Sequence, residues 1–260
     1  MSTFIDKLKR LSHEAPRSMG FRVTQPVSPA KPKMQLVISV TEASIKPLAD
    51  YIEGADAGLL RISSNSTAKT LQKVSQTMPD IPWGGWLQDN GLEAIKQVNQ
   101  AGYDFVVFSA TNTPLAILQD DAVGKIVEVE ASLGDGLLRA VNKLPVDAVL
   151  VAGDPAKGQS LTWQHLMLFR RLADLLTKPL LVTIPPKVTS AELQALWDAG
   201  VNGVVVEITA EIPKDTVKEL RRLIDQLTLP SPHREKIEPR LSPVVQEPNL
   251  ETDEEEEEEE

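Results

Sequence analysis

The sequence predicts an α/β fold, a closed (β/α)8 barrel in which eight parallel strands alternate with helices. Three observations lead to this prediction. Apolar runs of strand length alternate with helical patterns from residue 34 to residue 229, and this alternation is typical of a parallel sheet. The number of strand–helix units is eight, which is the number that closes a barrel. A turn motif also recurs before every second strand.

The expected strands are short and apolar, as in a sheet that is covered by helices on both faces. They are Gln35–Val40, Gly58–Ile62, Pro82–Leu87, Phe105–Ser109, Ile126–Ala131, Ala148–Ala152, Leu180–Ile184 and Gly203–Ile208. The expected helices are Ile45–Glu53, Thr67–Thr77, Leu92–Gln100, Pro114–Asp121, Gly136–Lys143, Leu161–Leu176, Ser190–Asp198 and Pro213–Leu227.

The turn motif precedes the second, fourth, sixth and eighth strands. It reads Gly54-Ala55-Asp56, Gly102-Tyr103-Asp104, Pro145-Val146-Asp147 and Gly200-Val201-Asn202. Glycine supplies the left-handed turn that ends a helix, and Asp or Asn suits the tight loop that follows. A repeat of two strands and two helices through the whole region favours a closed barrel over an open doubly wound sheet.

The barrel, residues 34–229, is preceded by a leader, residues 1–33. Residues 3–11 form an amphipathic pattern with Phe4, Ile5, Leu8 and Leu11 on one face, and a proline-rich linker follows. The helix either packs on the body and closes one end of the barrel, or serves as a tethered docking helix for a protein partner or a membrane surface.

Residues 230–260 form a proline-rich tail that ends in an acidic run. Its composition predicts disorder, with a role either in solubility or in binding a basic partner. The last ten residues hold nine acids, so removing them from the net charge of −10 leaves about −1 for the rest of the chain. A nearly neutral body argues against nucleic-acid binding.

The composition excludes several other classes. Cysteine is absent, which removes disulfides, thiolate nucleophiles and cysteine metal sites. No apolar run approaches the roughly 20 residues of a membrane span, and no signal-peptide pattern is present. The sequence therefore predicts a soluble, cytoplasmic protein.

The end of the repeat region, Ala199-Gly200-Val201-Asn202-Gly203-Val204-Val205, resembles the last repeat of aldolase-type TIM barrels. That resemblance implies glycine-rich turns after the seventh and eighth strands that hold a phosphate or flavin. Here those places read Ile184-Pro185-Pro186-Lys187 and Glu207-Ile208-Thr209. Proline lacks the N–H that a phosphate needs, and Glu207 would repel the anion, so FMN or a sugar phosphate is not expected at the usual site, and the sequence leaves the cofactor unknown.

A site in this fold lies at the C-terminal ends of the strands, and strand alternation sorts the candidates there. The catalytic candidates are carboxylates because these residues can exchange a proton with a ligand. They are Glu130, Glu207 and Asp154. The ligand-binding candidates are Arg61, Ser63, Asn65, Trp86, Ser109 and Thr183.

Arg61, Glu128 and Glu130 are expected to point into the barrel and to form an ion-pair cluster, since charges in a barrel are costly unless they pair. The cluster either only fills the barrel or contributes a carboxylate pair for proton transfer. A third possibility is a Mg²⁺-type oxygen site built from Glu130, Asp154 and Glu207.

Two loops are more ambiguous. The run Ser63-Ser64-Asn65-Ser66-Thr67 could bind an anion or simply cap a helix. In Trp83-Gly84-Gly85-Trp86, one tryptophan is expected to point inward, and the glycines indicate the close approach of another group. The glycines could simply make room for the indoles, or an indole could stack on a planar ligand.

Histidine chemistry is not predicted. His13, His165 and His233 fall in the leader, a helix and the tail, and no lysine ends a strand. The sequence thus favours a barrel that binds a small organic ligand, with carboxylate-based catalysis as an option. The alternative is a non-catalytic scaffold that contacts a protein partner through the leader helix or the acidic tail.

Overall fold

A computed structural model describes residues 2–12, 33–41, 52–62, 81–87, 98, 100–119, 123–152, 160–209 and 212–228. All of them belong to one compact unit, Met1–Leu229. The helices expected in residues 45–53, 67–77 and 92–100 lie wholly or largely outside the described residues. The linker and the tail of residues 230–260 also lie outside them.

Eight parallel strands close into a barrel in the order β1 to β8, as the sequence predicts. The strands are β1 (Gln35–Thr41), β2 (Ala57–Ile62), β3 (Trp83–Leu87), β4 (Phe105–Ser109), β5 (Gly124–Val129), β6 (Ala148–Val151), β7 (Leu180–Ile184) and β8 (Gly203–Glu207). The barrel closes where β8 pairs with β1. The largest difference from prediction is β5, which both begins and ends two residues earlier than expected.

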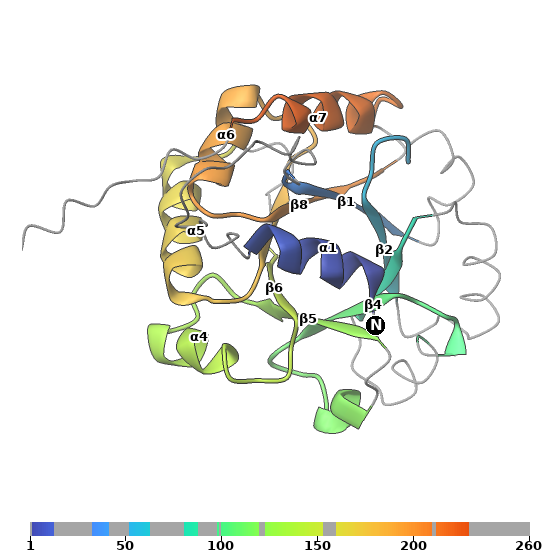
Figure 1. The fold of residues 1–260 in the computed structure, drawn as a ribbon, viewed down its shortest axis with the longest axis vertical. Helices are drawn as coiled ribbons and strands as arrows, with labels where there is room; N and C mark the ends of the chain where they lie inside the picture. The colour runs from blue at the N-terminus through green and yellow to red at the C-terminus, as the bar shows by residue number, and fades with distance from the viewer. Residues whose placement is uncertain are drawn as a thin grey trace, which may run out of the picture. The chain divides into compact units, whose positions relative to one another are not determined.

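Helices cover the outside of the barrel, and one further helix crosses one of its ends (Figure 1). The helices are α1 (Thr3–Ser12), α4 (Asp135–Val141), α5 (Trp163–Leu175), α6 (Ser190–Asp198) and α7 (Thr216–Asp225), together with a 3-10 helix, η3 (Leu115–Gln119). The 3-10 helix replaces the α-helix expected at residues 114–121. No helix in the described part of the chain is long and apolar enough to cross a membrane.

Strand alternation divides the core into two parts. In β1, Leu36, Ile38 and Val40 belong to the cluster between the sheet and the outer helices. Val37 belongs to a second cluster that fills the barrel. The polar residue Ser39 has the same parity as Val37, so it faces the interior near the C-terminal end of the strand.

The turn motif has the predicted backbone conformation. Gly54, Gly102 and Gly200 have φ values of 102°, 78° and 95°, which residues with a Cβ rarely adopt. The acidic or amide residue has a further role that the sequence did not indicate, because in three of the four motifs it accepts a backbone hydrogen bond from the preceding strand. Asp56 accepts from Leu36 N–H at 2.8 Å, and Asn202 accepts from Leu180 N–H at 2.8 Å.

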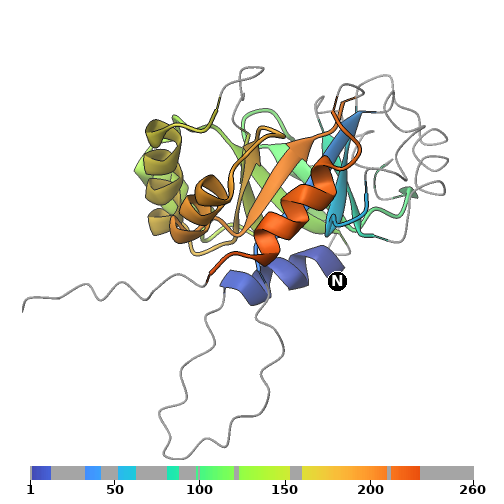
Figure 2. The same cartoon turned by 90° about the horizontal axis from the view of Figure 1, so that it is seen from above.

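The leader helix α1 packs across the end of the barrel where the strands begin (Figures 1 and 2). Phe4 and Leu8 have 0% of their surface exposed and Ile5 has 3%. All three belong to the cluster that fills the barrel, and the rings of Phe4 and Phe105 lie 4.7 Å apart. The structure therefore supports the first reading of this helix, in which it closes one end of the barrel.

The end of the barrel where the strands begin, which we call the barrel floor, leaves room for α1 because small residues point inward there. A Cβ added at Gly124 would lie 2.5 Å from Cγ1 of Ile5 and 2.9 Å from Cβ of Ser2. At such distances the neighbouring atoms of Ile5 and Ser2 would have to shift. Glycine at the start of β5 is thus a requirement of helix docking, which explains why this strand begins at a residue with poor strand propensity.

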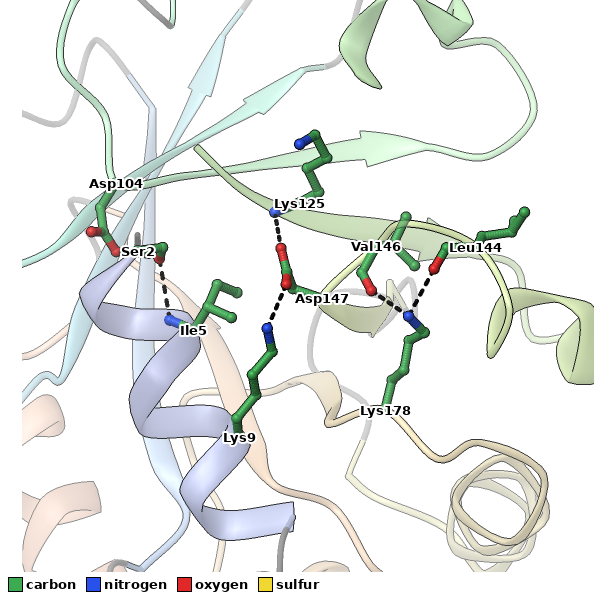
Figure 3. A network of polar contacts seen from close by, with 9 residues as sticks. All are labelled: Ser2, Ile5, Lys9, Asp104, Lys125, Leu144, Val146, Asp147 and Lys178. Carbon is green, nitrogen blue, oxygen red and sulfur yellow. Dashed lines mark hydrogen bonds and ion pairs between the residues drawn. The ribbon is translucent and has the colours of Figure 1, made fainter. Parts of the chain in front are cut away.

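Asp104 holds the first turn of α1 (Figure 3). Its carboxylate accepts hydrogen bonds from the Ser2 hydroxyl at 2.6 Å, from the backbone N–H of Thr3 and Phe4 at 2.8 and 2.9 Å, and from the Thr3 hydroxyl at 3.0 Å. Burial by itself would raise the pKa of Asp104, but these hydrogen bonds to the ionised form outweigh it, and the pKa lies below its ordinary value.

Asp147 joins the other end of α1 to the floor (Figure 3). Lys9 Nζ lies 2.7 Å from one carboxylate oxygen of Asp147, and the other oxygen accepts from Lys125 N–H at 2.9 Å. Nearby, Lys178 donates to the carbonyls of Leu144 and Val146. Burial lowers the pKa of Lys178, while the charge of Asp147 opposes that shift.

Candidate functional site

The upper part of the barrel interior is polar, in contrast to its apolar middle. The polar residues lie near the C-terminal ends of strands and have the parity that points inward. Six of them are Ser39 of β1, Arg61 of β2, Trp86 of β3, Glu128 of β5, Thr183 of β7 and Glu207 of β8. We call these six residues the mouth layer. Beneath them, residues such as Leu59, Ile126 and Leu150 fill the barrel.

Arg61 forms an ion pair with Glu207, with 3.2 Å between Nη2 and Oε2. The two strands are not neighbours, since β1 lies between β2 and β8. The side chains are 25% and 40% exposed. The predicted direct pairing of Arg61 with Glu128 or Glu130 was therefore wrong: an arginine is long enough to reach past one strand, and alternation alone does not identify its partner.

Glu128 is connected to Arg61 through Trp86. The guanidinium carbon of Arg61 lies 4.8 Å from the centre of the Trp86 ring, within the range of a cation–π contact. The indole N–H of Trp86 donates to Glu128 Oε2 at 2.7 Å. One chain of contacts thus runs from Glu207 through Arg61 and Trp86 to Glu128, and Trp86 is the inward tryptophan that alternation predicts.

Three polar atoms of the mouth layer are buried and have no hydrogen-bond partner among the described residues. They are Ser39 Oγ, Thr183 Oγ1 and Arg61 Nε. Ser39 is only 1% exposed and Thr183 only 7%. Most buried polar atoms in folded proteins are satisfied, so atoms that are not satisfied call for an explanation. Strand alternation predicts that Ser39 faces the interior, but Ser39 is not among the ligand-binding candidates.

Two other candidates are engaged locally. The strand β5 ends at Val129, so Glu130 follows the strand instead of lying within it. Its side chain is exposed and accepts from the Ser132 hydroxyl at 3.1 Å. Ser109 ends β4, and its hydroxyl accepts from Thr111 N–H at 3.3 Å. These contacts say nothing about a functional role. Both orient the side chains toward their own loops.

Ser63, Asn65 and Asp154 lie outside the described residues, so the hydroxyl-rich loop and the predicted Mg²⁺-type site have no geometry to report. Among the residues that the structure describes, no group of three or more His, Asp or Glu side chains could hold a metal ion. His165 lies in α5 as expected, where it takes part in the capping box with Thr162.

The glycines beside Trp86 serve packing, although not by making room for the indoles. A Cβ at Gly84 would lie 2.2 Å from the ring of Phe105, and one at Gly85 would lie 2.8 Å from Cδ1 of Ile62. The space for Trp83 is made instead by Gly58, whose added Cβ would lie 2.3 Å from that ring.

No family model and no curated protein matches the chain. Solved structures do match it. Three variants of the tryptophan synthase alpha-subunit from the hyperthermophile Pyrococcus furiosus have TM-scores of 0.56, 0.58 and 0.57 at 12%, 14% and 13% identity. Each comparison covers 75% of this chain and 98% of the alpha-subunit. At this identity the likeness concerns the fold alone, and that fold is a TIM barrel, a closed barrel of eight parallel strands.

Proposed function

We propose that this barrel binds a small organic ligand at its C-terminal mouth, in the mouth layer around Arg61 and Glu207. The observation that carries the proposal is a set of three buried atoms that have no hydrogen-bond partner in the described part of the chain, Ser39 Oγ, Thr183 Oγ1 and Arg61 Nε. Leaving a buried polar group without a partner costs roughly 1–3 kcal/mol. A ligand that forms these hydrogen bonds would remove the cost, and the position agrees with where sites of this fold lie.

If the ligand reacts, Glu207 is our candidate for the proton acceptor. It is the carboxylate at the end of β8, half-exposed toward the mouth, and Arg61 holds one of its oxygens. A positioned carboxylate within reach of the ligand suits general base catalysis. Asp154 remains a candidate on sequence grounds. Glu130 is a weaker one, since its carboxylate bonds to Ser132.

The scaffold alternative has less support. It depended on the leader helix and the acidic tail as contact elements. The apolar face of α1 is occupied, since Phe4 and Leu8 are fully buried against the barrel floor. A helix whose apolar face is already packed is not free to dock on a partner with that face. Of the two predicted contact elements, the acidic tail remains for this role.

Arg61→Met tests the proposal, because it removes the charge but retains an aliphatic side chain. Fluorinated amines, acids, amides and alcohols can be screened for binding by ligand-observed fluorine NMR. We expect those that bind the wild-type protein to change in affinity about tenfold or more in the variant, with acids binding more weakly once the positive charge is removed. Glu219→Gln, on the exposed face of α7, is the control for a loss of charge away from the mouth.

The opposite result would be fragment affinities that do not change, together with an increased free energy of unfolding in Arg61→Met. A buried ion-pair network that only fills space is often less stable than an apolar replacement. That outcome, or a screen without any binding fragment, would contradict the proposal.

A further inference from the structure

We infer that the ligand of the mouth layer carries a primary ammonium group, which binds beside Glu207 and between the hydroxyls of Ser39 and Thr183. The inference rests on the proposed function and adds the chemical class of the ligand. It starts from the observation that these three side chains belong to three consecutive strands of the barrel, β7, β8 and β1.

The register places the three side chains on one arc of the inner wall. Ser39 and Glu207 are direct Cα partners across β1 and β8. Thr183 is the partner of Val205, which precedes Glu207 by two residues on the same face of β8. A carboxylate therefore lies between two hydroxyls, one at its own level and one a step deeper in the barrel.

The hydrogen-bonding capacity of this arc matches an ammonium group. A primary ammonium has three N–H donors and no acceptor. Ser39 Oγ and Thr183 Oγ1 can both accept, and neither has a partner among the described residues. Arg61 contacts Oε2 of Glu207, and the carboxylate has a second oxygen with acceptor capacity of its own. Three acceptors are thus available for three donors.

Charge decides between an ammonium and an anion, because hydroxyl groups can also donate. The six residues of the mouth layer include two carboxylates, Glu128 and Glu207, and one guanidinium, that of Arg61. The Arg61 charge already interacts with Glu207 and with the Trp86 ring. An anion between the hydroxyls would lie beside Glu207 and be repelled, whereas a cation would be attracted, and both effects are stronger inside a protein than in water.

The same position disfavours a phosphate. The sequence that follows β7 is Pro185-Pro186, which offers no backbone N–H, and β8 ends in Glu207. Phosphate sites on barrels of this fold depend on N–H donors at these two turns. The residues that remove a phosphate site are thus compatible with an amine site.

Matched probes test the inference with the full-length protein. Para-fluorobenzylammonium has three N–H donors. Its trimethylated analogue has the same charge and no donor, and para-fluorophenylacetate has the opposite charge. We expect the primary ammonium to bind at least about tenfold more tightly than the trimethylated cation, as the loss of hydrogen bonds to a charged group implies. We expect the arylacetate to bind most weakly.

Substitutions test whether the preference for the primary ammonium depends on Ser39, Glu207 and Thr183. The affinity for the primary ammonium probe should fall about tenfold or more in each of three variants, Thr183→Val, Ser39→Ala and Glu207→Gln. The two variants that lack a hydroxyl, Thr183→Val and Ser39→Ala, should bind the trimethylated cation with unchanged affinity. Glu219→Gln is the control for Glu207→Gln, and thermal unfolding verifies that each variant is folded.

The outcomes separate this inference from the proposed function. If the arylacetate binds more tightly than the ammonium and loses affinity in Arg61→Met, the mouth binds anions: the ligand class is wrong and the site stands. If the primary and trimethylated cations bind equally, the hydroxyls do not bind an ammonium and the inference is also wrong. If no probe binds, or none depends on any mouth-layer residue, both proposals fail.

Discussion

The carboxylate of Asp104, just before β4, accepts a hydrogen bond of 2.9 Å from the backbone N–H of Phe4 in α1. In the equivalent turns, Asp56 and Asn202 accept from the strand that precedes them in the chain. The carboxylate of Asp104 instead binds the leader helix. The leader is thereby an integral part of the barrel, and its attachment involves a group that titrates.

This attachment predicts a dependence on acid. The pKa of Asp104 is lowered in the folded protein, so its contribution to stability is complete above the ordinary aspartate value of about 3.9 and is lost as the pH falls through the folded value. Urea unfolding between about pH 6 and pH 3 should show a steeper loss of stability in wild-type protein than in Asp104→Asn.

Asp215→Asn is the matched control, since Asp215 stands at the N-cap of α7 without a side-chain capping hydrogen bond. It should follow the wild-type curve. Identical pH profiles for Asp104→Asn and wild type would mean that Asp104 does not hold the helix as an ionised group.

The apolar contacts of α1 predict a large effect of truncation. Leu8 is fully buried against the barrel interior, so Leu8→Ala should lower the free energy of unfolding by about 2–5 kcal/mol. Lys7→Ala, on the exposed side of the same helix, should cost little. Equal, small effects of the two substitutions in urea unfolding would show that α1 does not pack on the floor.

Two Gly→Ala substitutions, one in a strand and one in an exposed helix, should have opposite effects on stability. At Gly84 a Cβ would lie 2.2 Å from the Phe105 ring, whereas at Gly136 in α4 nothing lies within 4 Å. Gly84→Ala should destabilise the protein by about 1–3 kcal/mol through overpacking, and Gly136→Ala should stabilise it by about 0.5 kcal/mol. A neutral Gly84→Ala, measured by thermal unfolding, would contradict the packing described for β3 and β4.

The barrel itself could be predicted from the sequence because its signals are local. The apolar strands and the glycine turns at Gly54, Gly102 and Gly200 depend on backbone conformation and on burial on both faces, which a short window of residues reveals. The start of β5 could not be predicted in this way. Gly124 and Lys125 are poor strand formers, and the glycine is required by Ile5, a residue far away in the chain.

The candidate site was predicted only as a region. Alternation placed Arg61, Trp86 and Glu207 on the inner face, and the structure brings these three together. Strand alternation did not identify the partner of Arg61, because an arginine side chain is long enough to reach carboxylates on several strands. Nor could it identify Ser39 and Thr183 as unsatisfied, since that property depends on the absence of partners around a buried atom.

Thr183→Val tests the central claim, that the mouth layer is a ligand site, most directly. Valine has nearly the same shape and removes a buried hydroxyl that has no partner among the residues that the structure describes. We predict that the free energy of unfolding rises by about 1 kcal/mol while the affinity for the primary ammonium probe falls about tenfold. A more stable protein with unchanged affinity would contradict the account, because the hydroxyl would then serve neither stability nor binding.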